Sequence, residues 1–110
     1  MQKLVNYHSN LAHGTVFRFP GSYPHEKYVD LILVEFPDND RKFGLVVSTG
    51  HKAGLILVKL PKEAESNNFA GIDRQWVIDN WNKWIYETCN VDDVYVIQNY
   101  PIPVIDYSKP

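Results

Sequence analysis

Leu31-Ile32-Leu33-Val34-Glu35-Phe36-Pro37 is echoed by Leu55-Ile56-Leu57-Val58-Lys59-Leu60-Pro61 later in the same chain. Each stretch is rich in aliphatic residues and stops at a proline, which is typical of a buried β-strand. A third strand, residues 43–49, lies between them and is separated from each by a short turn. Two successive hairpins would place the repeated strands on either side of the third strand, both antiparallel to it.

The apolar runs 31–34 and 55–58 do not alternate between polar and apolar residues. Strands with this pattern are usually covered on both faces, because either face would otherwise expose aliphatic side chains to water. We therefore expect a helix on one face of the sheet and the rest of a strongly curled sheet on the other.

Two further strands are predicted outside the repeat. Residues 15–19 alternate and end at Pro20-Gly21, and residues 93–97 form the last strand. The first repeated strand begins at Tyr28, while residues 1–14 read as a polar lead-in without a clear structure. After Tyr100, prolines keep the tail extended and out of the middle of the sheet, so we expect Ile102, Val104 and Ile105 to tuck in along the surface.

One helix is predicted after Asp73, which is a good N-cap residue. Ile72 and Val77 have the spacing of a hydrophobic staple around that cap. A broad apolar arc carries the three tryptophans, which we expect in the core or at its rim: Trp76, Trp81 and Trp84. The predicted fold class is α+β, a single domain over residues 1–110 with a curled, mostly antiparallel sheet of about five strands packed against this tryptophan-rich helix.

Length and composition exclude several classes of protein. The chain has 110 residues, of which 45% are hydrophobic and 22% charged, as in one soluble globular domain. No apolar run approaches the roughly 20 residues of a membrane-spanning helix. A single cysteine, Cys89, allows no intrachain disulfide, and the start lacks the apolar core of a secretory signal. These features predict a cytoplasmic protein.

The charge distribution favours a protein partner over nucleic acid. The formal net charge is −2, and Arg41-Lys42 is the densest basic pair, so no concentrated basic face for nucleic acid is expected. Residues 87–106 instead carry carboxylates and no lysine or arginine. Tyrosines are interleaved with these carboxylates, and tyrosine combines a rigid apolar face with a polar tip, as interfaces use. Such a surface could attract a basic partner, although a solvated acidic face is the commoner meaning of such a pattern.

The sequence contains only weak matches to catalytic and metal-binding patterns. Ser48, Thr49 and His51 put two hydroxyl groups near an imidazole, but adjacent positions do not supply the geometry of a nucleophile and its base. Asp38-Asn39-Asp40 starts like a calcium-binding loop, but the later glycine and glutamate positions fail, so a hairpin turn is favoured. Cys89 has no basic neighbour to activate it. No cofactor, metal or catalytic residue is predicted.

Three segments resemble a family of bacterial immunity proteins that accompany polymorphic toxins, including toxins of contact-dependent growth inhibition. They are Gly14-Thr15-Val16-Phe17-Arg18-Phe19-Pro20, residues 43–55, and the helix from Trp76 to Ile85. The resemblance covers about residues 14 to 97 and rests on core, turn and helix residues. It implies a cytoplasmic protein that binds one toxin domain, often a nuclease, and blocks it stoichiometrically; it assigns no contact residues.

The leading hypothesis is thus a non-enzymatic toxin inhibitor that contacts neither nucleic acid nor membrane directly. An interface of standard size would bury about 800 Å² per partner. We predict contacts from carboxylates and aromatics of the C-terminal half: Asp92, Asp93, Tyr95 and Glu87, with Asp79 and Trp76 on the helix. The alternatives are a small hydrolase or nuclease using His51, and a sensor with a tryptophan-lined pocket for a small ligand or peptide.

Overall fold

The computed structural model describes residues 1–21, 27–100 and 104–108. It confirms the α+β class, with an open sheet of six strands in the order β1-β6-β2-β3-β4-β5. The strands are β1 (Gln2–Lys3), β2 (Val16–Pro20), β3 (Tyr28–Glu35), β4 (Phe43–Val47), β5 (Ile56–Lys59) and β6 (Tyr95–Ile97). All neighbouring strands are antiparallel.

The two predicted hairpins are confirmed: β3 and β5 flank β4, and both pair with it antiparallel. Polar turn chemistry closes the first hairpin, because the Asp38 carboxylate accepts the backbone N–H groups of Asp40 and Arg41 at 2.9 and 3.2 Å. In the second connection, Gly50 and Gly54 adopt φ values of 70° and 94°, which glycine reaches without strain.

The N-terminal lead-in contributes more than expected. Residues 2–3 form β1 at one edge of the sheet, beside β6, and give the sixth strand. The following 3-10 turn, η1 (Leu4–Asn6), begins a segment that buries Leu4, Tyr7 and Leu11 in the core. The sequence did not predict this strand, because two residues are too few to show an alternation of polar and apolar side chains. The strand is also held in place by β6, which lies more than 90 residues later in the chain.

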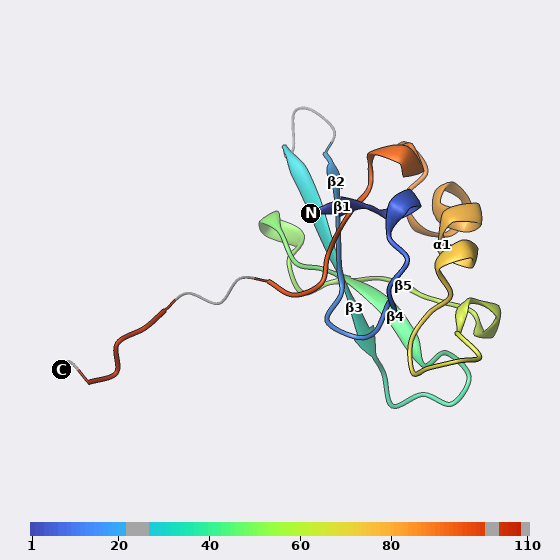
Figure 1. Cartoon of the computed structure of the whole chain (residues 1–110), viewed down its shortest axis with the longest axis horizontal. Helices are drawn as coiled ribbons and strands as arrows, with labels where there is room; N and C mark the ends of the chain where they lie inside the picture. The colour runs from blue at the N-terminus through green and yellow to red at the C-terminus, as the bar shows by residue number, and fades with distance from the viewer. Residues whose placement is uncertain (22–26, 101–103, 109–110) are drawn as a thin grey trace.

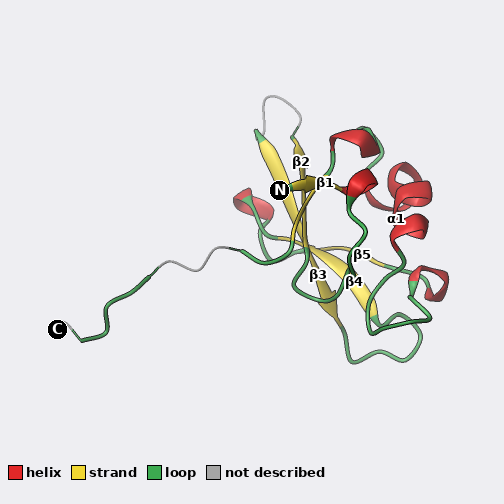
Figure 2. Cartoon of the chain, in the orientation of Figure 1, coloured by secondary structure: helices red, strands yellow, loops and turns green. Residues whose placement is uncertain are grey.

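One helical layer covers one face of the sheet. The layer contains α1 (Arg74–Asn80) and the turn η4 (Trp81–Ile85), and Figures 1 and 2 show it with most other helical turns on one side of the strands. Trp81 lies completely buried at its centre, with ring centroids 6.0 Å from Phe17 and 5.4 Å from Phe19. Trp76 and Trp84 are half-buried at the rim of the core, as predicted.

The predicted helix begins as expected but changes geometry midway. Asp73 caps it by accepting the Trp76 N–H at 3.2 Å, and both residues of the predicted staple, Ile72 and Val77, are buried. At Asn80 the side-chain amide donates to the Trp76 carbonyl at 2.9 Å, and residues 81–85 continue with π-helical bonding. An asparagine that binds the carbonyl four residues back competes with the regular ladder, which accounts for the break.

The prediction that both faces of the repeated strands are covered is wrong for the second repeat. Leu55, Ile56 and Leu57 are 59%, 53% and 39% exposed. β5 is the last strand of the sheet and has a neighbouring strand on one side only, β4. Burial of an aliphatic strand depends on what packs against it, which the run of residues does not specify.

The expected tucking of the C-terminal tail is also wrong where it can be checked. Val104 and Ile105 are exposed, and Figure 1 shows residues 104–108 away from the body of the domain. Ile102 lies outside the described residues. None of the described helices is long and apolar enough to cross a membrane.

Candidate functional site

A polar network stands on the sheet face that the helix does not cover. Its centre is Asp30 on β3, which is only 1% exposed although it carries a carboxylate. Arg18 on β2 lies opposite in the strand register and donates from Nε and Nη2 to the two carboxylate oxygens at 2.7 and 2.8 Å. A bidentate arginine–carboxylate pair of this kind is stronger than hydrogen bonds between neutral groups, and it compensates the charge of the buried carboxylate.

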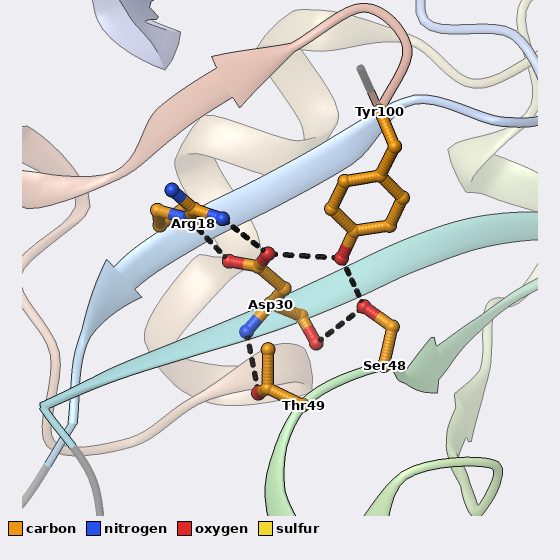
Figure 3. A network of polar contacts seen from close by, with 5 residues as sticks. All are labelled: Arg18, Asp30, Ser48, Thr49 and Tyr100. Atoms are coloured by element: carbon orange, nitrogen blue, oxygen red, sulfur yellow. Dashed lines mark hydrogen bonds and ion pairs between the residues drawn. The ribbon is translucent and has the colours of Figure 1, made fainter. Parts of the chain in front are cut away.

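Tyr100 closes the network from above the strands (Figure 3). Its hydroxyl donates to the Asp30 carboxylate at 2.9 Å and makes a short hydrogen bond with the hydroxyl of Ser48, just after β4. Ser48 shares its one hydroxyl hydrogen between Tyr100 and the Asp30 carbonyl, which lies 3.3 Å away, and the Asp30 N–H donates to the Thr49 hydroxyl at 3.1 Å. The network therefore ties the chain after β6 to β3 and to the end of β4.

Electrostatics follows from this geometry. The hydrogen bond to Asp30 raises the pKa of Arg18 above its usual value, and the centre of the Tyr28 ring lies 4.3 Å from its guanidinium carbon. Burial raises the pKa of Tyr100 above 10.0. Every oxygen of the Asp30 carboxylate already accepts a hydrogen bond from within the chain. Because the carboxylate oxygens are already hydrogen-bonded within the chain, the network is suited to holding the strands together.

The Ser48–His51 segment does not form a nucleophile–base pair in the described contacts. The Ser48 hydroxyl is engaged with Asp30 and Tyr100, while His51 is exposed in the turn η2 (Gly50–Lys52). Cys89 is buried, and burial together with the charge of Asp93 raises the pKa of its thiol above 9.0. Among the described residues, no group of three or more His, Cys, Asp or Glu side chains could hold a metal ion.

Three of the predicted contact residues lie along one acidic segment. Glu87 follows η4, and Asp92 and Asp93 lie in the turn η5 (Val91–Asp93); all three are exposed. Asn82 organises this segment, because its side-chain amide donates to the carbonyls of Glu87 and Cys89 at 3.1 and 2.6 Å. We call Glu87, Asp92 and Asp93 the acidic patch.

The other three predicted residues are distributed over two faces. Asp79 is exposed on α1 and accepts from Gln75 at 2.9 Å, and Trp76 packs half-buried against Trp84 with centroids 5.9 Å apart. Tyr95 on β6 pairs with Arg18, so its side chain belongs to the sheet face of the polar network. A single flat interface therefore does not present all six predicted residues.

Arg18, Asp30 and Tyr100 were not among the residues predicted from the sequence to form a site. A signal was present: Arg18 and Asp30 are charged residues set within or beside apolar strand runs, where an unpaired charge would be costly. Their pairing depends on the register of β2 and β3, which the sequence did not supply.

The chain was compared with known proteins. The family model described as Immunity protein 45 matches residues 4–96, which covers most of the chain, including the helix and β2 to β5. Searches of the curated proteins and of the solved structures match nothing.

Proposed function

The chain belongs to the Immunity protein 45 family, and on that premise we propose that it neutralises its cognate toxin by binding the toxin domain directly, one copy to one. The family makes it an immunity protein of a polymorphic toxin system. The mechanism we propose is occupation of the toxin's working surface, with no catalytic step by the immunity protein.

The acidic patch is the observation that carries the proposal. Its three exposed carboxylates lie in consecutive turns, with no lysine or arginine from Glu87 to Asp106. Of the further predicted contacts, we propose Asp79 and Trp76 on α1 as additional contacts from the helical layer, and Tyr95 belongs to the opposite side of the sheet. Carboxylates with aromatic neighbours suit a partner that presents lysine and arginine.

We further propose that the toxin is a nuclease and that the two proteins meet in the cytoplasm. A nuclease needs a cationic surface to bind the phosphate backbone, and an acidic inhibitor complements that surface. Nucleic acid is the substrate in the cytoplasm, so an inhibitor acting on the folded nuclease has to be present there.

The direct test is co-expression of the chain with its cognate toxin domain, followed by co-purification. We expect cells to survive and the two proteins to elute together in a 1:1 ratio. Survival without physical association would contradict direct inhibition. In a titration, toxin activity should reach its minimum at one equivalent of immunity protein; complete inactivation by far less than one equivalent would instead indicate turnover.

The acidic patch is tested by reversing its charge. We expect Glu87→Lys combined with Asp92→Lys and Asp93→Lys to slow association by about tenfold or more at low salt, because oppositely charged surfaces steer encounter. Glu63→Lys, at an exposed carboxylate on the turn η3 (Lys62–Ala64), is the matched control and should change the rate little. Wild-type association that is independent of salt would remove this mechanism.

A further inference from the structure

Two tyrosines and an arginine lie together on the sheet face that carries the polar network. Arg18 on β2 pairs across the strands with Tyr95 on β6, and the Tyr28 ring at the start of β3 lies over the Arg18 guanidinium. Tyr28 is two residues before Asp30, the other cross-strand neighbour of Arg18, so all three side chains belong to one face. We call Arg18, Tyr28 and Tyr95 the tyrosine–arginine patch.

The hydrophobic core does not account for these two tyrosines. Tyr28 is 46% exposed, and neither tyrosine is among the described side chains that form the core or pack against it. Trp76 and Trp84, by contrast, both pack against the core. Tyrosine and arginine are the residue types that concentrate binding energy at the centres of protein interfaces. The patch is therefore suited to contact with a protein partner.

The patch is held rigid before any partner arrives. The guanidinium of Arg18 uses Nε and Nη2 to bind both oxygens of the Asp30 carboxylate, and it lies against the ring of Tyr28. The Arg18 side chain is still 30% exposed, and its Nη1 makes no hydrogen bond within the part of the chain that the structure describes. A partner that binds this preorganised group loses little side-chain entropy.

Charge specifies the chemistry of that partner. The carboxylate of this face, Asp30, is buried and already bound by Arg18. Two lysines border the patch: Lys3 on the neighbouring strand β1 and the exposed Lys27 just before β3. Ammonium and guanidinium groups only donate hydrogen bonds, so the complementary group on the partner is a carboxylate. A second copy docked through the same patch would bring like charges together, which disfavours it.

The tyrosine–arginine patch adjoins the acidic patch at the start of β6. Asp93 ends η5, and Tyr95 begins β6 two residues later, so their Cα atoms are at most about 7 Å apart. One partner can therefore reach both surfaces. Such a partner presents cations to the acidic patch and carboxylates to the tyrosine–arginine patch, and this alternation of charge fixes the orientation in which the two proteins dock.

We propose that the tyrosine–arginine patch is a second contact surface for the toxin and receives a loop that carries aspartate or glutamate. The inference rests on the proposed function, because the same toxin domain is bound at the acidic patch. It also gives a role to Tyr95, whose side chain lies on the face opposite the helical layer.

Oxidative footprinting of the wild-type protein tests the contact directly. Hydroxyl radicals oxidise exposed tyrosines, and mass spectrometry measures the extent at each one. We expect the cognate toxin domain to reduce oxidation of Tyr28 at least about threefold, because a bound partner excludes solvent from its ring. Tyr107, which is 88% exposed in the C-terminal tail, is the matched control and should be oxidised equally in both states. Unchanged oxidation of Tyr28 would overturn the proposal. A decrease that needs only a higher concentration of the free chain would assign the patch to a second copy and also overturn it.

Affinity measurements with the toxin domain test the chemistry of the contact. We expect Tyr28→Ala to raise Kd at least about tenfold, and Tyr107→Ala to leave it unchanged. Lys27→Glu should raise Kd at least about threefold, because it places a negative charge beside the toxin carboxylate. Lys62→Glu, at an exposed lysine of η3, is the matched control and should have no effect. Wild-type affinity of Tyr28→Ala or of Lys27→Glu would contradict the proposal, and the footprint of the wild type decides the contact even if a variant is unstable.

Failure of this inference differs from failure of the proposed function. If the complex forms and charge reversal of the acidic patch weakens it while Tyr28 stays as oxidised as in the free chain, only the second contact is wrong. If no complex forms, or if charge reversal has no effect, the proposed function fails and this inference fails with it.

Discussion

The strands β3 and β5 carry nearly the same aliphatic sequence, yet they occupy opposite environments. In β3, Leu31 and Leu33 are completely buried beneath the helical layer, whereas the corresponding Leu55 and Leu57 are exposed. The second repeat buries its end, Leu60, instead of its middle. β3 has a neighbour on each side, β2 and β4, and β5 has only β4. Position in the sheet, more than residue type, decides how much each of these side chains contributes to the free energy of folding.

The two strands also hold their charges differently. Asp30 at the start of the β3 run is buried and bound by Arg18 and Tyr100. Lys59 at the end of β5 pairs with Asp38 at 3.3 Å, with both side chains more than one-third exposed. A buried pair that loses one partner leaves an uncompensated charge, while water replaces the partner of an exposed pair. The comparison predicts unequal effects from matched substitutions.

The largest expected difference comes from truncating equivalent leucines. Leu31→Ala should lower the free energy of unfolding by about 3 kcal/mol, because it removes buried contacts and leaves a cavity. Leu55→Ala, at the same place in the repeat, should change it by no more than about 0.5 kcal/mol. Urea unfolding of both variants measures the difference. Equal losses would show that Leu55 is packed in solution.

The charged pairs give the next effect. Arg18→Met should lower the free energy of unfolding by about 3 kcal/mol, because the Asp30 carboxylate stays buried without its main partner. Lys59→Met is the control at the exposed pair and should leave the urea midpoint unchanged. If Arg18→Met also left the urea midpoint unchanged, the polar network would not stabilise the fold as its geometry implies.

Tyr100 gives the smallest effect and a pH dependence. Tyr100→Phe should cost about 1 kcal/mol at neutral pH through lost hydrogen bonds. Because burial raises the folded-state pKa of Tyr100 above 10.0, its stabilising contribution is complete below pH 10 and is lost as the pH rises through the folded-state pKa. Wild-type stability should therefore fall more steeply than that of Tyr100→Phe in this alkaline range. If the stability of the two proteins changed with pH in parallel, burial of the Tyr100 phenol would be contradicted. Cys89 is present in both proteins, so it cannot cause a difference between them.

Local patterns predicted much of the fold. The two hairpins, the Asp73 cap and the core role of the tryptophans follow from short-range rules of turns, caps and periodicity. Two features were not predicted: the strand β1 and the switch from α-helical to π-helical bonding after Asn80. A two-residue strand is too short to show alternation of polar and apolar residues. A hydrogen bond from the Asn80 side chain to the backbone does not change the hydrophobic pattern of the helix. The acidic patch was read from charge alone and its role in binding stays a prediction. The Asp30 network needed the register between strands.

The amino-acid sequence by itself determined the four longest strands, the start of the helix, their order along the chain and the family, since these depend on neighbouring residues and their spacing. Only the tertiary structure decided which copy of the aliphatic repeat is buried and which charge is paired. The physical reason is that burial and pairing are properties of long-range contacts. Two stretches of nearly identical composition can differ fully in them when one lies inside the sheet and the other at its edge.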